Sequence, residues 1–373
     1  MAERSGRKSS KPMSTPELSI SLPLRRRARK RRTILIVSAV VLLGVSITSI
    51  SLGSAGIPFA EVWRSVWAGI FHRGEGLPGG ITLGTYAVVW DIRLPRVFMA
   101  LICGAALSTC GAGMQGVLRN PLVSPYTLGI SSGAAFGASL VIVLGGSLLS
   151  LAGEYLLIVL SAFLFSSAAV ALVLFLSRMK GMRAETLILA GIAVMYGFSA
   201  GTSILQYIST HEELARIVFW LMGSLTSTAW SEVGVAALFL AAGYPILYLC
   251  AWHLNILGSG RDVAKSLGTD PKRITTLVIV TSTLVTASIV SFTGIIGFIG
   301  LVGPHIARLV VGNDHRVLIP SSALLGAFFL VLSDTAARNL LGYTEIPIGI
   351  VTSVIGVPFF VSILVRRARS RGM

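Results

Sequence analysis

Long apolar runs separated by short polar segments dominate this sequence. Nine runs contain no Asp, Glu, Lys or Arg: 33–60, 97–118, 120–153, 155–177, 186–210, 233–260, 274–307, 317–333 and 346–365. Because about 20 apolar residues cross a bilayer as a helix, each run is long enough for a membrane span.

The run 274–307 is too long for one span. Its centre, 294–303, holds four glycines and is followed by Pro304, and both residue types interrupt helices. We therefore predict two spans there. The expected fold is an all-α polytopic membrane protein with ten transmembrane helices, at 34–53, 97–117, 127–147, 155–177, 187–208, 234–253, 274–292, 299–311, 317–336 and 346–365.

Composition supports a membrane protein and charge orients it. Hydrophobic residues make up 54% of the 373 and charged residues 12%, which is more apolar surface than one soluble core hides. The net charge of +16 is concentrated at the ends: residues 1–32 hold 11 basic and 2 acidic groups (+9), and 366–371 add four arginines. Basic flanks mark the cytoplasmic side, so an even number of spans predicts that both termini are cytoplasmic.

This charge pattern divides the chain into three parts. We expect a disordered basic arm over 1–32, a ten-helix domain over 33–366 and a basic tail over 367–373. The run after the arm is long enough to span, so we interpret it as a first transmembrane helix and not as a secretory signal. Neither end carries interleaved aromatic residues, so the bilayer is an expected partner and nucleic acid is not.

A polar island, 258–273, interrupts the apolar second half of the chain. Its sequence GSGRDVAKSLGTDPKR predicts a short helix at 261–267 and a turn at 268–271. The topology places the island in the cytoplasm, where we expect a soluble partner to bind it.

The chain shows no recognisable catalytic chemistry. It has no HExxH, GxSxG or GxxxxGK[ST] motif, its five histidines are scattered, and Cys103, Cys110 and Cys250 lie in apolar segments without metal-ligand spacing. We expect no catalytic set, metal site or bound cofactor on this chain. ATP-driven transport would therefore need an ATPase on another polypeptide.

Charged residues are scarce within the predicted spans. Asp334 and Arg338 have the i,i+4 spacing of a helical ion pair. A proton- or sodium-coupled carrier normally has intramembrane acids or histidines, so their scarcity argues against that class. An intramembrane enzyme would need a buried nucleophile or a set of metal ligands, and the sequence shows neither pattern.

Two further segments allow two readings each. Arg93-Leu-Pro-Arg96 precedes the second span at the outer face. Its arginines either anchor the helix at the membrane interface or form a docking site for an acidic partner. The double-proline segment 119–125 on the cytoplasmic side is either a gate or an ordinary tight turn.

The motifs together resemble a known family. RLPR ending at Arg96, RNPL ending at Leu122, AKSLG ending at Gly268, GFIGLVGPHIAR ending at Arg308 and IPIG ending at Gly349 follow the order of the FecCD-type permeases. These are the transmembrane subunits of type II ABC importers for iron-siderophores, haem or cobalamin. The resemblance covers about 34–366.

The resemblance implies a dimer of ten-helix subunits, with a second copy or a homologue, in a bacterial plasma or inner membrane. The translocation path lies at the dimer interface, two ATP-binding subunits dock beneath it, and an extracytoplasmic substrate-binding protein docks outside. Residues 258–270, within the polar island, would form the pair of coupling helices. Ferric siderophore is the expected cargo; haem and cobalamin remain alternatives, as does an ion-coupled secondary carrier from another class.

The resemblance also assigns residues by position. It implies ATPase coupling by Arg261, Asp262, Ala264, Lys265, Leu267 and Gly268; binding-protein docking by Arg93, Arg96 and Arg338; a cytoplasmic gate at Asn120 and Leu122; and a path lined by Met195, Tyr196, Ser199, Ser203 and Gln206. One departure from the cobalamin pattern is Arg183-Ala184, which replaces a Ser-Thr pair before the fifth span.

Overall fold

The structure is a computed structural model that describes residues 17–53, 56–71, 81–145, 153–179, 181–341 and 344–371. Within these ranges the chain is helical and contains no strand. Among the described residues, seven helices are long and apolar enough to cross a membrane. The all-α membrane class predicted from the apolar runs is therefore confirmed.

The first helices extend further than the apolar runs. Helix α1, Glu17–Ser51, begins inside the arm that we expected to be disordered, because its Leu- and Arg-rich sequence favours helix. The amphipathic helix α2, Phe59–Phe71, follows it. The second span starts before residue 97: α3 (Leu83–Ala87), a π-helical turn (Val88–Arg93) and α4 (Leu94–Leu118) are continuous. The π-turn lies next to Pro95, which cannot donate a backbone hydrogen bond.

The middle of the chain contributes a second group of helices. A 3₁₀ turn, Pro125–Leu128, leads through Gly129 (φ 86°) into α5, Ile130–Leu144. Helix α7 is Glu154–Arg178, α8 is Ala184–Ile208, and α9, His211–Met222, is a short amphipathic helix.

The last third of the chain confirms the predicted break in the run 274–307. Helix α13 (Pro271–Thr293) ends before Gly294, at φ 67°, and α14 (Ile299–Val311) begins after Phe298, at φ 66°. Ahead of them, the predicted span 234–253 is divided into α10 (Trp230–Leu249) and α11 (Ala251–Gly258), followed by α12 (Arg261–Ser266). Helices α15 (His315–Asn339) and α16 (Ile348–Arg371) complete the chain.

Each of the ten predicted ranges overlaps a helix. However, α5, α14 and the apolar part of α16, Ile348–Ser362, are shorter than the seven candidate spans. Ten membrane crossings therefore stay a prediction.

Helix α4 forms the centre of the bundle and is buried along almost its whole length. Small residues allow its neighbours to approach closely: a side chain added at Gly104 would collide with the backbone of Gly326 on α15, and one at Gly111 with the backbone of Gly300 on α14. The three cysteines are buried and free. Gly104 and Gly111 thus serve close packing of α4 against α15 and α14.

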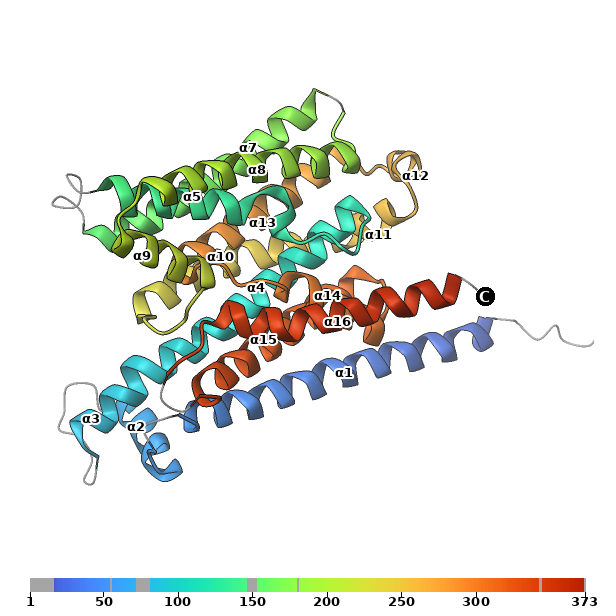
Figure 1. The fold of residues 1–373 in the computed structure, drawn as a ribbon. Coiled ribbons are helices and arrows are strands. Elements are labelled where there is room, and N and C mark those ends of the chain that lie inside the picture. Colours follow the sequence, from blue (N-terminus) through green and yellow to red (C-terminus); the bar gives the residue numbers. More distant parts are fainter. Residues whose placement is uncertain are drawn as a thin grey trace, which may run out of the picture.

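The bundle has two distinct ends (Figure 1). The start of α1, the end of α16 and the short helix α12 lie at one end, and α2, α3 and α9 lie toward the other. We call these the α12 end and the α2 end.

Candidate functional site

Helix α12 is a short, well-defined element held at the α12 end. Arg261 Nη1 donates to the carbonyl oxygen of Met182 at 2.8 Å, and Ala264 is fully buried. At its C-terminus Gly268 adopts φ 77°, its amide bonds the carbonyl of Lys265 at 3.0 Å, and the Thr269 amide bonds that of Ala264 at 2.9 Å. This is a Schellman cap, so the prediction that Gly268 ends the helix is confirmed.

The next helix starts directly from this cap. Asp270 accepts hydrogen bonds from the amides of Lys272 (2.9 Å) and Arg273 (3.4 Å) and so caps the N-terminus of α13. Thr269 is buried and its hydroxyl lies 3.0 Å from His253 Nδ1. These contacts therefore fix the orientation of α12 at both of its ends.

The outward surface of α12 combines charge with an apolar stripe. Val263 and Leu267, one turn apart, are 45% and 62% exposed. Asp262 and Lys265 are exposed beside them. A groove of about 850 Å³ lies alongside and is lined by Gly181, Arg183, Arg261, Asp262, Lys265, Gly268, Thr269, Asp270, Pro271 and Lys272. This end of the chain offers both a projecting helix and a recess to a soluble partner.

The segment with the predicted gate residues is an ordered turn. Arg119 has φ 51°, the Leu122 amide donates to Asn120 Oδ1 at 3.0 Å, and the buried Gln115 amide group donates to the Val123 carbonyl at 3.2 Å. Leu122 is 39% exposed. The turn borders a polar cavity of about 730 Å³ that also contacts Arg308 and His315.

An ion pair links the base of α1 to the same region. Asp314 accepts from Arg31 Nη1 at 3.1 Å and from Asn255 Nδ2 at 2.8 Å, and Asn255 Oδ1 accepts from the His315 amide at 2.9 Å. Burial opposes ionisation of Asp314, but the hydrogen bonds from Asn255 and the Arg316 amide, together with Arg31, hold the pKa of its carboxyl below its ordinary value. Arg31 belongs to the arm expected to be disordered, so at least this residue has a structural role.

The predicted path residues share an open face of α8. Tyr196 is 69% exposed, Ser199 and Ser203 are exposed, and Met195 and Gln206 are partly buried. Thr202 and Leu205 of the same helix are buried. The predicted path residues are therefore partly or fully uncovered in a single chain, and their role in the translocation path stays a prediction.

The three predicted docking arginines are not exposed. Arg96 Nε donates to Asp334 Oδ1 at 2.8 Å, and its Nη1 donates to Glu345 Oε2 at 2.7 Å. Arg338 Nε lies 3.1 Å from Asp334 Oδ2, so the predicted i,i+4 pair is confirmed. Arg93 donates to the carbonyls of Ile50 and Ser51 at 3.2 and 3.1 Å. All three side chains are buried and bound within the chain, and their docking role stays a prediction.

This arginine network joins elements that are far apart in sequence. Arg338 also donates to Ser49 Oγ at 2.7 Å, at the C-terminal end of α1, and Thr226 donates to Glu345 Oε2 at 2.9 Å. Burial opposes ionisation of Glu345, but Arg96 and the Thr226 hydrogen bond hold its pKa below the ordinary value. Sequence reasoning missed the roles of Glu345 and Thr226, because no local spacing relates them to Arg96.

Among the described residues, no three His, Cys, Asp or Glu side chains gather as metal ligands. The bundle of apolar helices, with the short polar helix α12 at one end, defines the class as a multi-pass membrane protein.

Comparisons with known proteins identify the family. Residues 40–366 match the FecCD transport family. An ABC transporter permease protein of Bacillus subtilis (strain 168) is 42% identical and covers 88% of this chain and 92% of its own length. A hemin transport system permease of Yersinia pestis is 35% identical, covering 89% and 95%. The solved inward-facing structure of a metal-chelate type ABC transporter superposes with a TM-score of 0.76 at 34% identity, covering 90% of this chain and 99% of that one.

The chain therefore belongs to the FecCD transport family and is an ABC importer permease. In this family the permease is a transport subunit and not an enzyme, and ATPase activity belongs to separate subunits. Relatives at 36%, 36%, 36% and 33% identity are named for cobalamin, molybdate, iron chelatin and Fe(3+)-citrate import.

Proposed function

We propose that this chain forms the membrane path of an ATP-driven importer for a ferric siderophore. Two copies, or this chain and a homologue, would enclose the path between their α8 faces, with ten crossings per chain and both termini in the cytoplasm of a bacterial cell. A substrate-binding protein would deliver cargo at the α2 end.

Helix α12 is the main support for the part of the proposal that concerns coupling to the ATPase subunits. It is capped at its C-terminus, tied to Met182 by Arg261, and presents Val263 and Leu267 to the aqueous phase. An exposed apolar stripe flanked by charge is typical of a protein-docking surface. We infer that Leu267 inserts into a groove of the ATPase subunit and that Lys265 and Asp262 contact its rim.

Substitution at Leu267 tests this coupling. Leu267→Asp places a charge in the contact, and we expect co-purification of the ATPase subunits to fall about tenfold, as at an interface hot spot. Leu267→Met, which keeps apolar volume, should retain them. The thermal transition of the isolated chain should not change, because Leu267 is 62% exposed. Full ATPase retention by Leu267→Asp would exclude α12 as the coupling element.

Iron-related names among the relatives support the siderophore cargo, although haem, cobalamin and molybdate relatives define the alternatives. Uptake should be measured with the cognate binding protein loaded in turn with a ferric siderophore, hemin, cobalamin and molybdate. We expect uptake of the ferric siderophore. Preferential uptake of any of the other three would replace the cargo assignment while leaving the importer class in place.

A further inference from the structure

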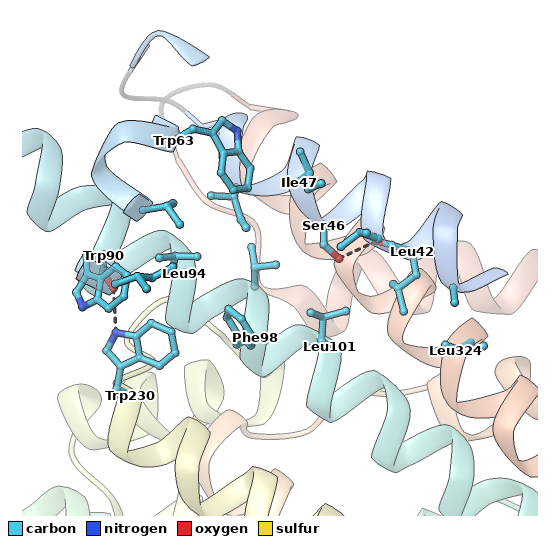
Figure 2. Close-up of a pocket in the computed structure, with 16 residues that line it drawn as sticks. Leu42, Ser46, Ile47, Trp63, Trp90, Leu94, Phe98, Leu101, Trp230 and Leu324 are labelled. Atoms are coloured by element: carbon cyan, nitrogen blue, oxygen red, sulfur yellow. Dashed lines mark hydrogen bonds between the residues drawn. The ribbon is translucent and has the colours of Figure 1, made fainter. Parts of the chain in front are cut away.

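An apolar crevice opens between α1 and α4 at the α2 end. Its volume is about 520 Å³, within the range of small-molecule pockets. Leu42 and Ile47 of α1 face Leu94, Phe98 and Leu101 of α4 across it (Figure 2). The lining has one hydroxyl, that of Ser46, which already donates to the Leu42 carbonyl at 2.8 Å. The other polar side-chain atoms of the lining are the ring nitrogens of Trp63, Trp90 and Trp230, and of these Trp63 Nε1 is buried without a hydrogen-bond partner. A buried water needs two to four polar partners, which one N–H donor does not supply, so the crevice favours an apolar occupant.

The crevice lies at membrane depth. Its α1 wall belongs to the candidate span Arg31–Ser51 and its α4 wall to the span Leu83–Leu118. Figure 2 shows Trp90 and Trp230 together at one end and Leu324 at the other. Trp230 Nε1 donates to the Trp90 carbonyl at 3.0 Å, and the two rings lie 5.7 Å apart. Because tryptophan concentrates at the membrane–water boundary, the crevice runs from that boundary into the hydrocarbon.

Helix α2 gives independent evidence for lipid at this end. Its packed side is small: Ser65, Ala68 and Gly69 are buried, and a side chain at Gly69 would collide with the Trp90 ring. Four of its large apolar residues are exposed instead: Phe59, Trp67, Ile70 and Phe71 are 57–62% exposed. A helix with this arrangement lies in the membrane interface with its apolar face in the acyl region. Trp63 and Ile70 of α2 also line the crevice.

We propose that the crevice binds one acyl chain of a phospholipid from the leaflet on the α2 side. At this depth acyl chains are the apolar molecules available, and the concave walls of α1, α2 and α4 would hold one chain apart from the surrounding lipid. This inference depends on the membrane placement of α1 and α4, and not on the cargo or the ATPase.

The bound chain has a mechanical consequence. Helix α1 is largely exposed along its span. The donors of Arg93 and Arg338 fix its end, at Ile50, Ser51 and Ser49. The acyl chain would fill the space between α1 and α4 next to this anchored end. It would thereby complete the packing of α1, which the protein alone covers only in part.

Photo-crosslinking of the intact transporter tests the proposal. The complex is reconstituted in phosphatidylethanolamine–phosphatidylglycerol nanodiscs that contain a phospholipid with a diazirine in the middle of one acyl chain. We expect labelling concentrated on 42–50 and 94–101. Ile47→Trp fills the crevice, so labelling there should fall about tenfold because no volume remains for the chain.

The matched control is Val41→Trp, the same change on an exposed position of α1 outside the crevice, which should keep the labelling. Leu101→Trp closes the crevice from the α4 side and should reproduce the loss, so the test does not depend on one variant folding. Labelling spread evenly over exposed α1 and α7 residues, or unchanged in both crevice variants, would overturn the proposal.

Discussion

At the residue scale, burial separates two kinds of charged group in this chain. Asp334 is fully buried, accepts a hydrogen bond from Arg96 and forms an ion pair with Arg338, whereas Glu154 and Arg216 pair at the surface with side chains 34% and 42% exposed. A buried charge that loses its partner has no water to replace it. The two sites therefore differ greatly in what their carboxylates contribute to stability.

Asp334→Asn should lower the free energy of unfolding by about 3–5 kcal/mol, because it removes the negative charge that compensates two buried guanidinium groups. Glu154→Gln is the control and should cost less than about 1 kcal/mol, as exposed pairs do. Unfolding by denaturant in detergent micelles measures both. An equal loss of unfolding free energy in the two variants would contradict the burial of Asp334 and its arginine partners.

The same burial limits what arginine substitution can reveal about docking. Reversing the charge of Arg93 or Arg96 would break hydrogen bonds to Ile50, Ser51 and Asp334 as well as any contact with a binding protein. Glu345, whose side chain is 42% exposed, is the most exposed charged group of this network and the better place to perturb it.

At the element scale, glycines set the distance between α4 and its neighbours. Gly104 and Gly326 face each other across α4 and α15, and neither has space for a side chain. By contrast, Gly44 on α1 has no atom within 4 Å of an added Cβ.

Gly104→Ala should therefore destabilise the protein by about 1–3 kcal/mol through overpacking. Gly44→Ala should leave stability unchanged or raise it by up to about 1 kcal/mol, since alanine is the better helix former. Thermal unfolding of the two purified variants compares them directly. A Gly104→Ala protein as stable as the parent would mean that α4 and α15 pack less closely than described.

The apolar runs predicted the long helices because each run alone satisfies the length of a span. They did not predict α2 and α9, which are 13 and 12 residues long and carry Glu61, Arg64, Glu212 and Glu213 within amphipathic patterns. The arginine network also lay beyond local patterns, because Arg96 and Asp334 are 238 positions apart. Spacing of i,i+4 revealed only the Asp334–Arg338 pair. The glycine cap at 268 was predictable because capping is a local property.

At the scale of the whole molecule, the two ends of the bundle have different chemistry. The α12 end carries a short charged helix beside polar recesses, and the α2 end holds a buried arginine network and an amphipathic helix rich in exposed aromatic residues. The helices between them supply no cluster of acidic or histidine ligands among the described residues. Because ATPase activity belongs to separate subunits in this family, we expect the transporter to take its energy from a soluble partner at the α12 end.

ATP-dependent uptake into proteoliposomes tests this central claim most directly. The chain is reconstituted with its ATPase subunits and loaded binding protein, with ATP inside or absent, and cargo entry is followed while proton and sodium gradients are imposed or collapsed. We expect cargo entry only with ATP and the ATPase subunits present, unaffected by either gradient. Gradient-driven entry through the chain without ATPase subunits would contradict it.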